Sequence, residues 1–296
     1  MKKGFIQSIV NSVGYNRDVK MLAIDPDDRV VRRLMKGSDA EPIKDWKSLK
    51  HYPSSSPVIF RGMGQRNTVK ACTKQGRDYL YIDTGYLGNL GKQKNWHRVV
   101  KNGMQHSMPR YDLPEDRFDK IIESLERQKN PVEGVEYLRF KNWKPEGSAI
   151  LLVTPSEKPC KFYGVDRDQW VSETITKLKK HTDREIIVRD KAERRIDRVG
   201  PNNIFQQFVE DDIYCVVTYN SIAAIEALCY GIPAFTMAPT AADDLCLKDL
   251  SMIESPLMAE PEKVIKWQNW LGYCQYYITE LEDGTALEIL EENDLR

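Results

Sequence analysis

The sequence alternates between short apolar runs and longer segments with helical periodicity. The runs are rich in β-branched residues, have the length of strands, and lie at residues 19–24, 57–60, 79–82, 96–100, 149–153, 185–188, 213–217 and 234–237. Amphipathic segments between them include residues 115–128, 169–180 and 220–230. Alternation of this kind predicts parallel sheets with helices on both faces.

The predicted elements fall into two sets that meet near residues 142–147. A chain of 296 residues is long enough for two domains that each bury a core. We therefore expect an α/β fold in which two Rossmann-like domains, residues 1–145 and 146–260, face each other across a cleft.

The C-terminal segment, residues 261–296, differs from the rest. It opens at Pro261 and carries one broad apolar stripe at helical spacing, formed by Trp267, Trp270, Leu271, Cys274 and Tyr277 or Ile278. This stripe predicts a helix that packs across the junction between the two domains.

Two classes of protein are excluded by composition. No apolar run approaches the roughly 20 residues that span a bilayer, which excludes a membrane protein. The 6 cysteines are scattered without a C-x-x-C spacing, which disfavours a disulfide framework or a zinc site. We expect free thiols in a reducing compartment, and hence a cytoplasmic protein, in the host cytoplasm if it is phage-encoded.

Charge is divided unevenly between the two halves. Residues 1–145 hold 28 Lys and Arg against 17 Asp and Glu, whereas residues 146–296 hold 16 against 27. Such asymmetry indicates a polyanionic partner for the basic half.

Within the basic half, residues 84–111 contain no acidic residue. Cations and rings alternate there, as in nucleic-acid grooves, and the candidate DNA-binding residues are Tyr86, Lys92, Lys94, Trp96, Arg98 and Lys101. The alternative is a solvated loop and an edge strand with ordinary surface lysines.

Residues 216–233 read as a buried strand, a turn, a helix, a glycine stop and a further strand. Asn220 or Ser221 can cap the helix, and the amides behind them form an anion site. In an open parallel sheet this turn lies at the carboxyl edge, where ligands bind. Glu226, within the helix, is near enough to reach a ribose. The alternative is a well-capped helix with one polar residue.

The run from Asn220-Ser221 through Glu226-Ala227-Leu228 to Gly231-Ile232-Pro233 resembles the donor-binding motif of GT-B glycosyltransferases, especially capsule-type sugar transferases. The pattern Trp270-Leu271-x-Tyr273-x-Gln275, with Glu280 and Gly284, is similar to the tail of phage-encoded glycosyltransferase-like proteins. The resemblance implies that the C-terminal domain binds a nucleotide-sugar and that a final helix crosses back to the first domain.

By this resemblance, Ser221 and the amides around it hold the donor diphosphate, and Glu226 holds the ribose hydroxyls. Further donor-binding candidates follow other strands: Ser156, Arg189 and Lys191. A turn-forming hydroxyl at Ser156 and a solvated loop at Arg189 and Lys191 are the alternatives. The expected donor is a UDP-sugar, with no tightly bound cofactor and no essential divalent metal.

Sugar transfer with inversion needs a base for the acceptor hydroxyl. Asp83 ends a strand directly before the acid-free window, and neighbouring cations keep it ionised; its alternative role is to cap the turn. His97 and His106 are the reserve candidates for the base. Asp25-Pro26-Asp27-Asp28 has the Asp-x-Asp pattern of metal-dependent glycosyltransferases, but it is also an ordinary turn or helix-start signal.

These observations predict a nucleotide-sugar-dependent glycosyltransferase, transferring a hexose or a pentose. The favoured acceptor is a 5-hydroxymethylpyrimidine such as hydroxymethylcytosine in bacteriophage DNA, a base that the enzyme would have to extrude. Two alternatives stay open: a capsule or lipopolysaccharide glycosyltransferase, and a non-catalytic nucleic-acid-binding protein. The sequence leaves open the sugar, the stereochemistry and the oligomeric state.

Overall fold

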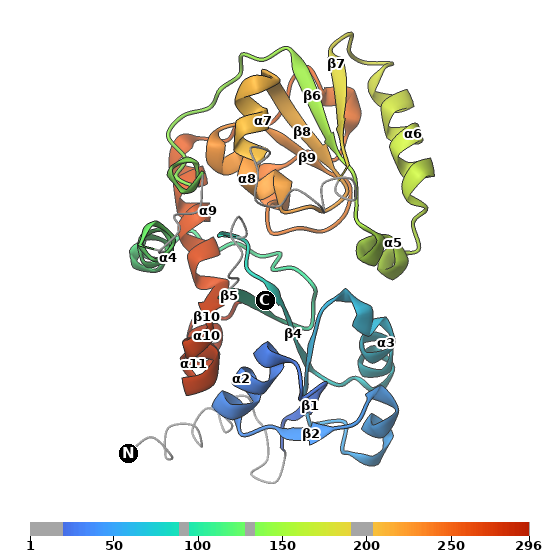
Figure 1. Cartoon of the computed structure of the whole chain (residues 1–296), viewed down its shortest axis with the longest axis vertical. Coiled ribbons are helices and arrows are strands. Elements are labelled where there is room, and N and C mark those ends of the chain that lie inside the picture. Colours follow the sequence, from blue (N-terminus) through green and yellow to red (C-terminus); the bar gives the residue numbers. More distant parts are fainter. Residues whose placement is uncertain (1–19, 89–94, 128–133, 191–203, 296) are drawn as a thin grey trace. The chain divides into compact units, whose positions relative to one another are not determined.

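The protein forms two compact units in a computed structural model that describes residues 20–88, 95–127, 134–190 and 204–295. The first unit comprises Met1–Gly85, Gln93–His106 and Tyr273–Arg296, and the second comprises Tyr86–Lys92 and Ser107–Gly272 (Figure 1). Residues 107–145, which the sequence prediction assigned to the first domain, thus belong to the second unit. No helix among the described residues is both long enough and apolar enough to cross a membrane.

The first unit is built on a six-stranded sheet in the order β10-β5-β4-β3-β1-β2. Its strands are β1 (Leu22–Ile24), β2 (Glu41–Ile43), β3 (Val58–Arg61), β4 (Tyr79–Thr84), β5 (Trp96–Lys101) and β10 (Gln275–Tyr277). β1 to β4 are parallel, whereas β5 runs antiparallel to β4 and β10 antiparallel to β5. The expected parallel sheet thus covers β1 to β4, and the sheet is extended by two antiparallel strands, because the connection from β4 to β5 is shorter than a parallel crossover needs.

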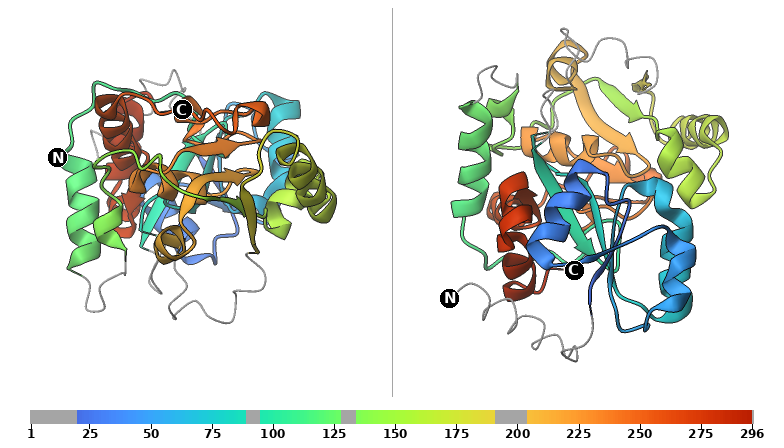
Figure 2. Two further views of the ribbon diagram at one scale, coloured as in Figure 1. Left: turned by 90° about the horizontal axis from the view of Figure 1, so that it is seen from above. Right: turned by 60° about the horizontal axis from the view of Figure 1, so that its bottom comes forward.

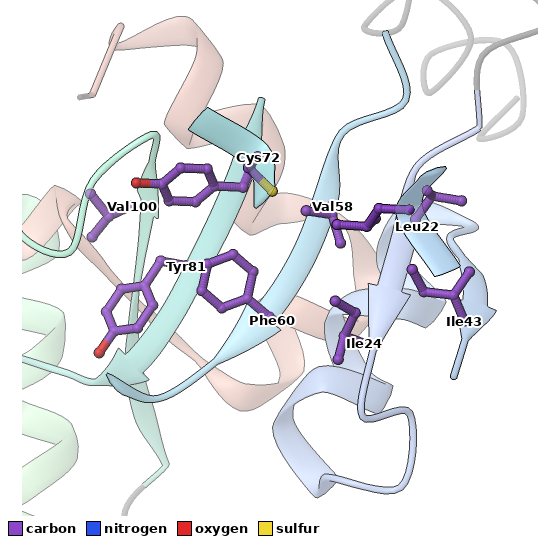
Figure 3. Close-up of a cluster of buried hydrophobic side chains, with 10 residues drawn as sticks. Leu22, Ile24, Ile43, Val58, Phe60, Cys72, Tyr81 and Val100 are labelled. Atoms are coloured by element: carbon purple, nitrogen blue, oxygen red, sulfur yellow. The ribbon is translucent and has the colours of Figure 1, made fainter. Parts of the chain in front are cut away.

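Helices cover both faces of this sheet. Helix α2 (Arg29–Ser38) and α3 (Arg66–Gln75) lie on opposite sides of the strands, as Figure 2 shows, and α10 (Ile278–Asp283) packs against α2. The last helix is α11 (Thr285–Glu292). On the α3 face, Leu22, Ile24, Val58, Phe60, Tyr81 and Val100 form a buried core with Ile43 and Cys72 (Figure 3).

The second unit is built on a four-stranded sheet in the order β7-β6-β8-β9, parallel throughout. Its strands are β6 (Ala149–Val153), β7 (Glu185–Arg189), β8 (Ile213–Thr218) and β9 (Ala234–Thr236). Its helices are α4 (Asp116–Glu126), α5 (Glu157–Tyr163), α6 (Arg167–Leu178), α7 (Ile204–Glu210), α8 (Ala223–Tyr230) and α9 (Pro261–Tyr273). Side chains alternate along β6, and Ile150 and Leu152 lie on the face that packs against α6. Helices α7 and α8 pack against each other and against β8.

Both units share one strand order. In each, the second strand pairs on one side of the first and the third on the other, which gives order 2-1-3-4 in the parallel part. Connections from the first and third strands therefore leave toward opposite faces and open a crevice at the carboxyl edge, where doubly wound folds bind ligands. This switch point lies between β1 and β3 in the first unit and between β6 and β8 in the second.

The C-terminal stripe is helical only in part. Helix α9 begins at Pro261, as predicted, and buries Trp267, Trp270 and Leu271. It ends at Tyr273, however, and β10 follows at once, so the extension of the helical stripe to Tyr277 is wrong. The chain returns to the first unit through β10, which pairs with β5.

Candidate functional site

The switch point of the second unit brings together two sequence-predicted donor residues. Ser156 lies beyond the end of β6, at the N-cap of α5, where it is half-buried and its side chain forms no capping hydrogen bond. Ser221 lies beyond the end of β8, just before α8. Because β6 and β8 are neighbouring parallel strands, the two hydroxyl-bearing turns flank the same crevice.

Hydrogen bonds hold the turn before α8 in place. The Thr218 hydroxyl donates to the Val153 carbonyl at 3.2 Å and accepts from the Ser221 amide at 3.3 Å. Ser221 Oγ in turn accepts from the Ala223 amide at 3.3 Å, and the Ala224 amide donates to the Ser221 carbonyl. The amides expected to be free for an anion thus already have internal acceptors, which leaves the Ser221 hydroxyl as the main polar group that a ligand could engage.

The other residues predicted around this turn differ in exposure. Asn220 is buried, whereas Glu226 is half-buried in the first turn of α8. A carboxylate at that position can accept hydrogen bonds from hydroxyls.

A cavity of about 410 Å³ opens beside the carboxyl ends of β6 and β7. Thr154, Arg167 and Asp190 form its polar end, and Val171, Ile175 and Val188 supply apolar walls. Arg167 forms an ion pair with Asp190, whose carboxylate also accepts a hydrogen bond from the Thr154 hydroxyl at 3.4 Å. Arg189, a predicted donor residue, is half-buried and donates to the Gln207 side chain. Lys191 lies outside the described residues.

Asp83, the predicted base, sits at the carboxyl end of β4 within a closely bonded group. Its carboxylate accepts hydrogen bonds from the Tyr81 hydroxyl at 2.5 Å, the Thr84 amide at 2.8 Å and the Arg98 guanidinium at 3.1 Å. Arg98 is directly opposite Asp83 in the antiparallel ladder. Burial favours a higher pKa for Asp83, but the Arg98 charge and these hydrogen bonds outweigh it and hold the pKa below 3.8.

Both reserve candidates for the base are buried in the first unit. Burial, followed by the charges of Arg61 and Arg29, lowers the pKa of His97 to about 4. Burial, followed by the charge of Arg98, lowers the pKa of His106 to about 3. Both imidazoles are therefore neutral at physiological pH and are weaker bases than an ordinary histidine.

These two histidines make stability depend on pH. A pKa lowered by folding means that the unfolded chain binds more protons between about pH 4 and 6.5, so stability falls as the pH drops through that range. We expect a loss of about 2 kcal/mol per histidine between pH 7 and pH 5. Urea unfolding at both pH values tests this, and His106→Gln should remove about half of the difference. An equal unfolding free energy at pH 7 and pH 5 in the wild type would contradict it.

Several described residues of the acid-free window are buried. Tyr86, Trp96 and Arg98 are 1%, 4% and 4% exposed. Trp96 packs edge-on against Tyr277, with 5.3 Å between ring centroids. Lys101 is half-buried, and Lys92 and Lys94 lie outside the described residues. The two buried rings cannot stack on bases, and the buried Arg98 guanidinium is paired with Asp83, so these three residues do not form the exposed DNA-binding surface expected from the sequence.

The opposed charges of the two halves also diminish when the units are counted as they fold. The first unit holds 20 Lys and Arg against 16 Asp and Glu, and the second holds 24 against 28. The acidic C-terminal segment joins the first unit, while much of the basic sequence before residue 145 joins the second. The strongest argument from composition for a polyanionic partner is therefore lost.

The Asp25–Asp28 motif has a structural role. Asp28 caps α2 by accepting from the Val30 and Val31 amides, and its second oxygen binds Arg61 at 2.8 Å. Partial burial works to raise the pKa of Asp28, but these bonds outweigh it and lower the pKa. Within the described ranges, no group of three or more His, Cys, Asp or Glu side chains is arranged to hold a metal ion.

Sequence reasoning missed a group of rings beside the second switch point. Tyr219, directly after β8, contacts Tyr163 and Trp170 at centroid distances of 5.7 and 5.8 Å. Tyr163 ends α5 and Trp170 lies in α6, so they precede Tyr219 by 56 and 49 positions in the sequence. The sequence contains one indication of this group, namely that Tyr219 directly follows a predicted strand.

Two α/β units of this kind in one chain define a fold of the GT-B class, as expected from the sequence. Similar solved structures include two from Thermosulfurimonas dismutans. The KpsC β-Kdo 2,4 transferase has a TM-score of 0.51 at 12% identity, over 87% of this chain and 92% of its own. The KpsC β-Kdo 2,7 transferase has a TM-score of 0.52 at 10% identity, over 93% and 99%.

Identities this low establish a common fold and no more. No protein-family model matches the sequence, and no curated protein matches it significantly.

Proposed function

We propose that this protein is a glycosyltransferase that moves an acidic sugar of the Kdo type from a nucleotide donor to a capsule-type saccharide. The observation that carries the proposal is the similarity of nearly the whole fold to two Kdo transferases, over 87% and 93% of the chain. This supports the capsule-type alternative over transfer to phage DNA. The near-balanced charges of the first unit and the burial of Tyr86, Trp96 and Arg98 favour the same choice.

The donor binds, in this proposal, at the switch point of the second unit. The Ser156 and Ser221 hydroxyls hold donor phosphate oxygens from the two sides of the crevice. Glu226 accepts from the ribose hydroxyls, and Asn220 positions the turn. Arg189, at the end of β7, supplies a cation for the departing phosphate or for the sugar carboxylate.

The reaction is a substitution at the anomeric carbon. The acceptor hydroxyl oxygen forms the new bond to that carbon, the bond to the donor phosphate oxygen breaks, and the nucleotide leaves with the bonding electrons. The acceptor hydroxyl loses its proton to a base, and the candidate for this base is Asp83 of the first unit, which is ionised at neutral pH because its pKa is lowered. Its bonds to Tyr81 and Arg98 fix the carboxylate in one orientation.

A transfer assay tests the proposal. The purified chain is incubated with nucleotide-activated Kdo and a Kdo-terminated oligosaccharide, with UDP-glucose and hydroxymethylated DNA in parallel arms. Mass spectrometry should show the oligosaccharide gaining one Kdo residue. A product confined to the DNA arm would overturn the capsule-type acceptor. The absence of product in every arm, with no thermal stabilisation by UDP, CMP, GDP or ADP, would overturn the glycosyltransferase itself.

A further inference from the structure

We propose that Tyr219, supported by Tyr163 and Trp170, is the surface on which the base of the donor nucleotide stacks. The inference rests on the proposed function, because it concerns the donor site of the second unit. It adds a base-recognition subsite formed by three rings from α5, α6 and the turn after β8.

The position of Tyr219 follows from the alternation of side chains along β8. Cys215 and Val217 belong to the core on the α6 side of the sheet, and Tyr219 continues that row one step past the end of the strand. The backbone after β8 leads to α8, yet the Tyr219 ring reaches rings on the α5 and α6 side. Tyr219 therefore lies at the carboxyl edge of the sheet, where the connections after β6 and β8 diverge.

The ring is held in place before any ligand binds. The Tyr219 carbonyl accepts from the amides of Met237 and Ala238, at 3.0 and 2.8 Å, which fixes the backbone. The planes of Tyr163 and Trp170 stand at 64° and 86° to that of Tyr219, the edge-to-face packing that aromatic pairs prefer. All three residues are only half-buried, so part of their surface stays accessible.

The spacing to the phosphate site suits a nucleotide. Tyr219 and Ser221 are two residues apart, so their Cα atoms are separated by at most about 7 Å. A nucleotide lying along this turn can place its base on Tyr219 and its phosphate near the Ser221 hydroxyl. Stacking on an aromatic ring is open to every base, because each has a π face.

The test compares a probe that contains a base with one that lacks it. Binding of CMP, UDP, GDP, ADP and ribose 5-phosphate is measured by calorimetry for the wild type and for Tyr219→Ala, Tyr219→Leu and Tyr219→Phe. Tyr137→Ala is the matched control, because Tyr137 is a partly exposed tyrosine of the same unit that packs on Phe205 and Tyr230. Tyr219→Leu keeps apolar bulk, so it serves if the alanine variant fails to fold.

We expect Tyr219→Ala and Tyr219→Leu to weaken binding of the preferred nucleotide about 5- to 150-fold. Tyr219→Phe and Tyr137→Ala should stay within about threefold of the wild type, and ribose 5-phosphate should bind all variants alike. Equal nucleotide affinity in the wild type and the folded Tyr219 variants would overturn the stacking proposal alone. An equal loss for ribose 5-phosphate would also overturn it, because the substitution would then act on the phosphate end. A wild type that binds none of the nucleotides would overturn the donor site, and the stacking proposal with it.

Discussion

Replacement of Gly231 by alanine is expected to lower the free energy of unfolding by about 2–5 kcal/mol. Gly231 ends α8 with φ at +94°, in the left-handed region, where a side chain costs about 1–2 kcal/mol. A Cβ atom there would lie 2.1 Å from the Asn142 carbonyl oxygen, in a backbone segment that also donates from the Lys144 amide to the Gly231 carbonyl. This overlap adds a packing penalty of about 1–3 kcal/mol.

Gly164→Ala separates the two contributions to this effect. Gly164 ends α5 with φ at +71°, but a Cβ atom there meets nothing within 4 Å. We therefore expect a loss of only about 1 kcal/mol, from backbone conformation alone. Urea unfolding of both variants measures the difference. Similar losses in the two variants would contradict the packing penalty assigned to overlap with the Asn142 carbonyl.

Replacement of Asp83 by asparagine is expected to lower kcat for sugar transfer about 10²-fold. A positioned general base contributes roughly 10²- to 10⁴-fold, and the lowered pKa of Asp83 makes it a weak base, which places the effect at the low end. Nucleotide affinity should not change, because the donor residues belong to the other unit. The variant also leaves the buried Arg98 charge without its anionic partner, so kinetics are compared at a temperature where thermal melting shows both proteins to be folded.

Tyr81→Phe is the companion variant. It removes the 2.5 Å hydrogen bond that helps to keep the pKa of Asp83 low, so that pKa should rise. We expect kcat to stay within about tenfold of the wild type, with its decline at acid pH beginning at a higher pH. If Asp83→Asn retained the wild-type rate, or lost nucleotide affinity along with it, Asp83 would not be the acceptor base.

The predicted strands were confirmed, and all of them except β7 are largely buried, so they read as apolar runs. Two short edge strands, β2 and β10, were missed. β2 has the sequence Glu41-Pro42-Ile43, whose proline and partial exposure hide a strand signal. β10 contains Tyr277, which continues the apolar spacing of α9 and so appeared helical. Periodicity cannot locate the point where a helix gives way to a strand of three residues.

The position of the turn proposed as the donor site could be predicted, because capping residues after an apolar run mark the carboxyl edge of a parallel sheet. The pairing of charged residues in the first unit could not be predicted. Arg98 counted as a free cation in the sequence, but strand pairing places it beside Asp83, 15 positions away. The acidic residues of α10 and α11 likewise join the first unit only because β10 pairs with β5. Local charge counts fail where distant segments pair.

Hydrogen–deuterium exchange with and without donor nucleotide tests the central claim most directly. The chain is saturated in turn with CMP, UDP, GDP and ADP, and exchange is followed along the sequence. A donor site at the second switch point predicts slower exchange at residues 154–160 and 218–226 with one of these nucleotides, while β1 to β3 are unchanged. Protection confined to the first unit, or none with any of the four nucleotides, would contradict it.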